Sequence, residues 1–511
     1  MSDELELLYD RYNQFSYFEY TICNPNTMIK ILREGAFDEA VLEEKIVEYE
    51  IKKRFQEDPS LYQEMVEDKN FVQPKSIMIR IHYFNLIIDS LPDSFFEGLD
   101  IGREMIKHIT ISIVMYYIGL EVYKFGPLQM HNEAYRKIIG RGDFYFTLNE
   151  LKMVCGKVTE SDFEKYMGLF ARDIEEIQDD SIERLYLKNG IPFVLRIVDF
   201  LDYIIYAMER TFKKSVVEEE FSRYTNLKGR AFETLAYDVI EGFFDEVYHT
   251  LYYYPKNVEK VELDIVIREK EKLAILECKS GTLWFDEAID NAAVKGIVKN
   301  GVKKAYKSLR KVADYCAEEK EYSIHSEKGI LSGIDEKPIC VHVSMYPLDF
   351  ISSNIHTIFP EYIQNQTNPI LTISFEQLCA ILLDLRRRDK NLFSYWEQRI
   401  DDIKNYPDIQ FDNNELDLYY ELINDDTMLS QLKKSGILNN LAPNAKIVSS
   451  FHNEYGYEER PALVMIKKLE WALQETIIDN GKKWFGINKR YLKNLKELLE
   501  IDLKINTSCD Y

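Results

Sequence analysis

The sequence lacks the features that mark secreted, membrane-bound or zinc-binding proteins. It has seven scattered cysteines and no Cys-x-x-Cys pair, so we expect reduced thiols rather than disulfides or a zinc site. Its eight histidines show no metal-ligand spacing. No basic and apolar leader is visible, and the longest uncharged apolar run, Ile109–Leu120, is too short to span a bilayer. These absences predict a cytoplasmic protein with no membrane association.

Positive charge is also scarce, since 64 lysines and arginines stand against 87 aspartates and glutamates, a net charge of −23. This balance argues against indiscriminate binding to nucleic acid. A nucleic-acid-binding protein of this composition must gather its basic residues locally. The chain also shows no P-loop, no Gly-x-Ser-x-Gly motif and no internal repeat, so nothing points to a nucleotide-binding, serine-hydrolase or repeat protein.

Two runs in the middle of the chain carry the most informative pattern. Residues 261–268 alternate between apolar and polar, which predicts a half-buried strand with Asp264 on its more polar face. The next run, 273–276, is apolar on both faces and predicts a covered strand, yet it ends in the charged stretch 277–279, Glu-Cys-Lys. Charges beside a buried strand are unfavourable unless something compensates them. This strand end therefore indicates chemistry.

The loop between the two runs sets their register. Its four charged residues, 269–272, predict a short hairpin. A symmetric hairpin places Asp264 opposite Glu277 and Glu262 opposite Lys279. Directly opposed side chains are about 5 Å apart at Cβ, so the two carboxylates repel each other unless a cation lies between them. A hard divalent cation with oxygen ligands fits that arrangement.

A helix is predicted immediately before the hairpin. Its apolar residues recur at helical spacing and form one stripe: Phe232, Leu235, Ala236, Val239, Ile240 and Phe243. Glu233 sits beside this stripe, at the rim of the buried face. Its carboxylate is therefore placed to reach over the sheet.

In this order, helix Glu, strand Asp and strand Glu-x-Lys resemble the PD-(D/E)XK nuclease superfamily, which has the restriction-endonuclease-like fold. The resemblance covers residues 225–385 and implies an α/β (α+β) domain with a mixed sheet flanked by helices. Two further strands, 339–346 and 370–373, and a helix at 375–385 preceded by a capping box suit that fold. His342 falls inside the third strand, where we expect a satisfied core residue rather than a ligand.

The resemblance also assigns roles to individual residues. It implies that Asp264 and Glu277 bind the metal and that Lys279 is the catalytic lysine. Glu233 would be a further metal ligand, and the carbonyl of Cys278 would be a backbone ligand. The sequence departs from the family at one position, because a leucine precedes Asp264 where the motif's name-giving proline would stand.

Two basic stretches are candidates for nucleic-acid binding. Residues 295–311 predict a helix with seven basic residues and no acidic one. Four of its lysines recur at every fourth position, with an arginine nearby: Lys295, Lys299, Lys303, Lys307 and Arg310. Residues 482–496 interleave basic and aromatic side chains, a pattern that suits phosphate pairing and base stacking or, equally, an amphipathic helix.

On either side of the nuclease-like domain the chain is predicted to be helical. Residues 1–220 form a large domain with a structural, sensing or regulatory role, and residues 386–511 form a smaller, mostly helical one. This layout is typical of bacterial restriction and antiviral defence systems. A homo-oligomer or a defence-system partner is compatible with it.

The sequence thus predicts a Mg²⁺-dependent nuclease, with Mn²⁺ able to substitute, that hydrolyses phosphodiester bonds. The pattern favours a DNA endonuclease and leaves open the choice between DNA and RNA. Each feature also has a plainer interpretation. Glu277-x-Lys279 could be a solvated strand end, and Glu262 and Lys279 could form an ordinary ion pair. Glu233 could be a glutamate in the first turn of its helix. The basic helix could be a solvated face. Two other functions stay open: a non-catalytic nucleic-acid-binding protein on a nuclease fold, and a repair exonuclease with a helicase partner.

Overall fold

The computed structural model describes residues between 76 and 496, apart from gaps of which the longest are 126–145, 282–300, 357–368 and 448–460. The chain divides into two compact units. One takes its described residues from Glu43–Thr225 and Lys467–Tyr511, and the other from Asn226–Ile466. The predicted helical structure of residues 1–75 lies outside the described residues. The division into three domains stays a prediction.

The first unit is largely helical, as the sequence predicts. Its described helices are α5 (Ile77–Ser90), α6 (Asp93–Gly98), α7 (Arg103–Phe125), α9 (Leu148–Val154), α10 (Glu160–Phe170) and α11 (Ile197–Ser215). Side-chain oxygens begin several of them: Ser76 accepts from the amide of Ile79, and Thr147 forms a capping box with Glu150. The middle of α7 is buried all round.

The first unit also contains a small sheet that the sequence prediction missed. Its strands are β1 (Arg172–Asp173), β2 (Leu185–Lys188) and β3 (Ile191–Val194). Asn189 and Gly190 both have positive φ, 53° and 76°, as a two-residue hairpin turn requires. The sequence predicts helical structure across residues 1–220, but the hairpin makes residues 191–194 a strand, and the next helix begins at Ile197.

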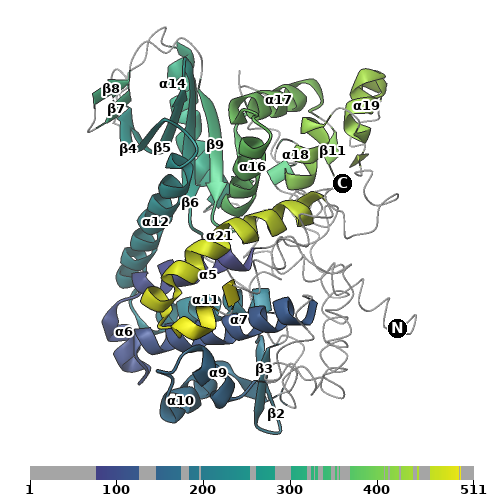
Figure 1. Cartoon of the computed structure of the whole chain (residues 1–511). Coiled ribbons are helices and arrows are strands. Elements are labelled where there is room, and N and C mark those ends of the chain that lie inside the picture. The colour runs from purple at the N-terminus through teal and green to yellow at the C-terminus, as the bar shows by residue number, and fades with distance from the viewer. Residues whose placement is uncertain are drawn as a thin grey trace. The chain divides into compact units, whose positions relative to one another are not determined.

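In the described residues of the second unit, seven strands form one mixed sheet in the order β10-β9-β6-β5-β4-β7-β8 (Figure 1). The strands are β4 (Glu246–Tyr253), β5 (Val261–Glu269), β6 (Lys272–Lys279), β7 (Ile324–Ser326), β8 (Gly329–Leu331), β9 (Ile339–Ser344) and β10 (Leu371–Ser374). β4, β5 and β6 pair antiparallel, whereas β6, β9 and β10 pair parallel. The mixed sheet is therefore confirmed, including the four strands that were predicted.

Helices flank this sheet. α14 (Lys303–Glu318) lies over the face that carries Glu277 and Thr372: its Ser308 hydroxyl donates to a Glu277 oxygen, and its Tyr306 hydroxyl donates to the carbonyl of Ile370. The helix before the hairpin is α12 (Glu218–Glu241), and its Phe232 packs edge-on against Phe375 of α16.

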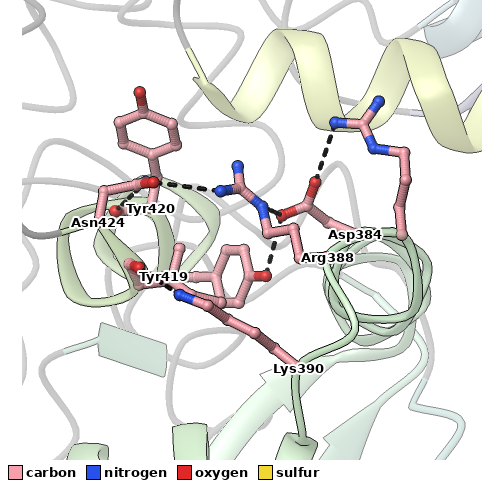
Figure 2. Close-up of polar contacts among 8 residues, drawn as sticks. Asp384, Arg388, Lys390, Tyr419, Tyr420 and Asn424 are labelled. Atoms are coloured by element: carbon pink, nitrogen blue, oxygen red, sulfur yellow. Dashed lines mark hydrogen bonds and ion pairs between the residues drawn. The ribbon is translucent and has the colours of Figure 1, made fainter.

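In the helical part after the sheet, the buried carboxylate of Asp384 accepts hydrogen bonds that connect neighbouring helices (Figure 2). It contains α16 (Phe375–Arg387), α17 (Leu392–Asn405), α18 (Glu415–Ile423), α19 (Met428–Lys434), a 3-10 turn (Ile437–Asn440) and the pair β11 (Gln410–Phe411) and β12 (Lys446–Ile447). Asp384 of α16 accepts from Arg388 at 2.6 Å and from the Tyr419 hydroxyl of α18 at 2.9 Å. Arg388 also donates to Asn424. The predicted capping box of α16, Ser374 with Gln377, is present.

The last described helix, α21 (Pro461–Phe485), begins in the second unit and ends in the first. No helix in the described part of the chain combines the length and apolar character needed to cross a bilayer. Four described cysteines, Cys155, Cys278, Cys340 and Cys379, are buried free thiols, as the sequence predicts for them.

Candidate functional site

The hairpin of β5 and β6 has the register that the sequence predicts. Glu269 faces Lys272, Arg268 faces Leu273, and the pairing runs without a bulge to Ile265 opposite Leu276. The alternation of β5 fixes which face is buried, and the symmetric loop fixes the pairing. The next two positions along the hairpin are Asp264 and Glu277.

The backbone pairing between the two strands stops at this point, and the strands separate into a fork. Beyond it, β5 continues beside β4, with Leu251 opposite Leu263, while β6 continues parallel to β9. Asp264 bridges the opening, because its Oδ2 accepts from the backbone N–H of Cys278 at 2.8 Å. A side chain thus takes the place of a backbone partner where the strands diverge.

Glu277 lies on the β6 side of the fork and is nearly covered, with 7% of its surface exposed. The ammonium of Lys279 lies 2.6 Å from its Oε1, and the hydroxyl of Ser308 donates to its Oε2 at 3.3 Å. Lys279 therefore pairs with Glu277 two residues earlier on the same strand. The alternative ion pair with Glu262 is absent from the described contacts of Lys279, and Glu262 is exposed.

α12 contributes the third carboxylate, Glu233, at the same end of the sheet. The space beside Gly229 is bordered by a Glu233 oxygen and by the hydroxyl of Ser280, which follows β6. The buried ammonium of Lys228 donates to the carbonyl of Gly281 and so ties α12 to the chain that leaves β6. Glu233 thus stands at the fork rather than in the first turn of its helix, since α12 begins at Glu218.

Burial and charge act together on these groups. Burial raises the pKa of Asp264 well above its usual range, and the charge of Glu277 raises it further, although Lys279 acts in the opposite direction. Burial also raises the pKa of Glu233, and Lys279 again opposes the shift. Burial alone would lower the pKa of Lys279, but Glu277 and Asp264 outweigh it and raise the pKa. The four side chains therefore form one electrostatic group.

The sequence did not identify two residues of this neighbourhood. Ser308 comes from α14, some thirty residues beyond the hairpin, and only the packing of that helix brings it to Glu277. Lys228 did leave a signal, because it lies four residues before Phe232 on the apolar stripe of α12, where a lysine is unusual.

His342 of β9 pairs with Glu277 in the parallel ladder and is 1% exposed. Within the described residues, neither of its ring nitrogens has a hydrogen-bond partner. Burial, together with the charge of Lys279, lowers the pKa of His342 to about 3. His342 is buried as expected, but the prediction that its polar atoms would be satisfied was wrong.

The predicted metal ligands are Asp264, Glu277, Glu233 and the carbonyl of Cys278. As the side chains stand, the described residues contain no group of three or more His, Cys, Asp or Glu side chains that could hold a metal ion. Two of these residues have other polar contacts: Lys279 lies against Glu277, and Asp264 accepts from the amide of Cys278. Successive peptide groups of a strand point to opposite sides, and the carbonyl of Lys279 accepts from Met345 beyond β9. The carbonyl of Cys278 therefore faces the fork, on the side of Asp264.

The basic helix is described in part. Lys295 and Lys299 lie outside the described residues, whereas Lys303 and Lys307 are exposed on α14 and Arg310 is half-buried on it. Lys304 and Lys311 are exposed as well. Since Ser308 of the same helix contacts Glu277, these lysines belong to an element that also borders the fork.

Comparisons with known proteins add little to this geometry. No family model and no curated protein matches the chain. Among solved structures, the crystal structure of protein VC1899 from Vibrio cholerae is similar, with 15% identity and a TM-score of 0.20 over 55% of this chain and 56% of that one. The chain thus spans little more than half the length of that protein. A TM-score of this size supports no conclusion on fold or function.

Proposed function

We propose that the fork between β5 and β6 is the active site of a metal-dependent nuclease on a restriction-endonuclease-like domain. The observation that carries this proposal is the meeting of Asp264, Glu277, Glu233 and Lys279 at one strand end. The hairpin, the parallel strand β9 beside it, and the preceding helix α12 agree with the arrangement that the sequence resemblance implies.

The excess of negative charge at the fork favours the binding of a divalent cation. When ionised, the three carboxylates carry three negative charges, and Lys279 supplies one positive charge, which leaves an excess of two. Burying such an excess is unfavourable, and the raised pKa values of Asp264 and Glu233 express that cost. A hard cation of charge +2 with oxygen ligands would neutralise the excess.

The residues that would hold the cation are Asp264, Glu277 and Glu233, together with the carbonyl of Cys278. When bound, Mg²⁺ or Mn²⁺ would polarise the scissile phosphate and promote the attack of water. Lys279 then presents a cation to the developing negative charge of the phosphate, since an ammonium donates hydrogen bonds and offers no lone pair to a metal. Ser308 holds Glu277 in place through Oε2.

The substrate we propose is DNA, bound in part by α14. The exposed cations Lys303, Lys304, Lys307 and Lys311 lie on this helix, and the first turn carries no acidic residue. In a chain of net charge −23, such a surface gives the phosphate backbone a local site of attraction. A role in bacterial restriction or antiviral defence remains part of this proposal.

The proposal is tested by incubating the purified protein with plasmid, linear duplex DNA and RNA, each with Mg²⁺, Mn²⁺ or EDTA. We expect plasmid to be nicked or linearised with either metal and to stay intact with EDTA. The Asp264→Asn variant keeps an acceptor for the Cys278 amide but removes the charge, and we expect it to be inactive. Equal cleavage by Asp264→Asn, or no cleavage of any substrate by the wild type with either metal, would refute the proposal.

A further inference from the structure

A second basic surface lies in the first unit, where the end of α21 meets the end of α9. Asn488 makes the joint: its amide N–H donates to the carbonyl of Val154 at 2.7 Å, and its side-chain amide donates to the carbonyl of Met153 at 2.8 Å. Gly486, with φ of +66°, lets the chain turn close to Lys157 and His108. Two segments more than 300 residues apart in the sequence are thereby fixed together.

Six exposed cations surround this joint: Lys152, Lys157, Lys482, Lys483, Lys489 and Arg490. We call them the junction cluster. None of the six forms an ion pair with a carboxylate among the described residues. Three acidic residues of the first unit have other contacts: Asp479 pairs with Lys496, Glu104 lies against Lys107, and Glu150 accepts from the amide of Thr147.

We propose that the junction cluster is a docking surface for the phosphate backbone of duplex nucleic acid, separate from the basic helix α14. The cations of the two segments repel one another in the free protein. A polyanion that binds there relieves this repulsion and also makes its own favourable contacts. The choice of nucleic acid among polyanions rests on the proposed function, whereas the cluster itself does not.

The aromatic residues of this stretch favour duplex over single-stranded nucleic acid. Phe485 is buried, Trp484 packs edge-on against His82, and the Tyr491 hydroxyl donates to the carbonyl of Met115 at 2.6 Å. These rings are used inside the protein and are not offered for stacking on bases. The sequence alone left open whether the interleaved aromatics would stack on bases, and these contacts assign them to packing.

The test measures binding of a labelled 20-base-pair duplex as a function of salt, in EDTA so that cleavage does not interfere. One variant replaces Lys482, Lys483, Lys489 and Arg490 by Gln, and a second replaces Lys152 and Lys157 by Gln. The matched control is Lys213→Gln with Lys214→Gln, because these exposed lysines occupy the last turn of α11 as Lys482 and Lys483 occupy that of α21. Thermal unfolding confirms that each variant is folded.

We expect the fourfold variant to reduce the slope of log affinity against log salt by roughly two to four, and the Lys152 and Lys157 variant to reduce it by about one to two, since each duplex phosphate contact contributes about 0.9. The control should keep the wild-type slope. Unchanged slopes in both cluster variants would overturn the proposal, as would equally tight binding of a poly-aspartate peptide of the same charge. A different result would contradict the proposed nuclease activity alone: a protein that binds the duplex through the cluster but does not cleave it in Mg²⁺.

Discussion

At the scale of single residues, Lys279 is the group whose role is most open to measurement. It is the sole described ion-pair partner of the nearly buried Glu277, at 2.6 Å. Under the proposed function, it neutralises Glu277 in the free protein and faces the phosphate during the reaction. A residue with these two roles should affect turnover without being needed to bind the metal.

We therefore expect Lys279→Ala to lose cleavage activity by at least a factor of about 100, as when one group that stabilises a transition state is removed. Its Mn²⁺ affinity should stay the same or become tighter, because Glu277 is left with an unpaired charge. Single-turnover cleavage and calorimetric titration with Mn²⁺ check the two parts. A large loss of Mn²⁺ affinity would show that Lys279 organises the metal ligands instead.

A second residue-scale prediction concerns His356, which is 2% exposed and bonds the carbonyl of Ile409 through Nε2. Burial lowers its pKa to about 4. The unfolded chain takes up this proton near pH 6.5 and the folded chain takes it up only near 4, so the stability due to neutral His356 is complete above pH 6.5 and is lost as pH falls toward 4.

Each pH unit in this window should cost about 1.4 kcal/mol of unfolding free energy. Urea unfolding at pH 7 and pH 5 is the measurement. The His356→Gln variant keeps a donor for Ile409 and should lose about 2 kcal/mol less than the wild type between these two pH values. Parallel losses in both proteins would mean that His356 is protonated in the folded state.

The sequence predicts a residue of the site only where that residue lies close in sequence to the hairpin motif. Asp264 and Glu277 lie on one hairpin, so the alternation of β5 and the length of the loop are enough to place them next to the last pair, Ile265 with Leu276. Ser308 and His342 reach the fork from α14 and β9, and no pattern near the motif specifies how those elements pack. The local part of the site was therefore predictable and the remainder was not.

At the scale of secondary structure, the same contrast holds. Strand β6, the capping box of α16 and the polar alternation of β5 are short-range signals, and they were predicted. β4 was missed, since its sequence EVYHTLYY mixes polar and aromatic residues without clear alternation and includes Thr250 at φ 52°. Its identity as a strand comes from pairing along β5, which is a tertiary contact.

The turn after α21 gives a prediction about backbone conformation. A Cβ at Gly486 would lie 2.8 Å from Nε2 of buried His108 and would occupy the left-handed region at φ +66°. We expect Gly486→Ala to lower the unfolding free energy by about 2 kcal/mol or more. Gly168→Ala is the control, because it meets nothing within 4 Å and lies exposed inside α10. It should raise stability by up to about 1 kcal/mol. Equal effects in thermal unfolding would contradict the described turn.

The contact between α16 and α18 gives a prediction about hydrogen bonding. Tyr419→Phe removes one buried bond to Asp384 and leaves Arg388 in place, so it should cost about 1 kcal/mol. Asp384→Ala removes the acceptor that Tyr419, Arg388 and Arg387 share and should cost about 3 kcal/mol. Urea denaturation compares the two variants. A Tyr419→Phe effect as large as that of Asp384→Ala would mean that the ion pairs of Asp384 with Arg387 and Arg388 contribute nothing to stability.

At the scale of the whole molecule, charge distribution explains how a protein of net charge −23 could act on a polyanion. Basic residues are concentrated on α14 in one unit and in the junction cluster in the other, while the fork concentrates carboxylates. The overall charge would repel DNA at long range, and these two surfaces would attract it locally. The composition alone predicted that such concentration was needed, but only the joint made by Asn488 shows that Lys152 and Lys157 belong with the C-terminal cations.

The central claim is that the fork holds a divalent cation, and this can be tested without knowledge of the substrate. The measurement is Mn²⁺ binding by electron paramagnetic resonance in the wild type, in Asp264→Asn and in Asp238→Asn, which removes the same charge from an exposed position on α12. We predict bound Mn²⁺ in the wild type and in Asp238→Asn, and its loss in Asp264→Asn. Binding that persists unchanged in Asp264→Asn, or no binding by the wild type, would contradict the account.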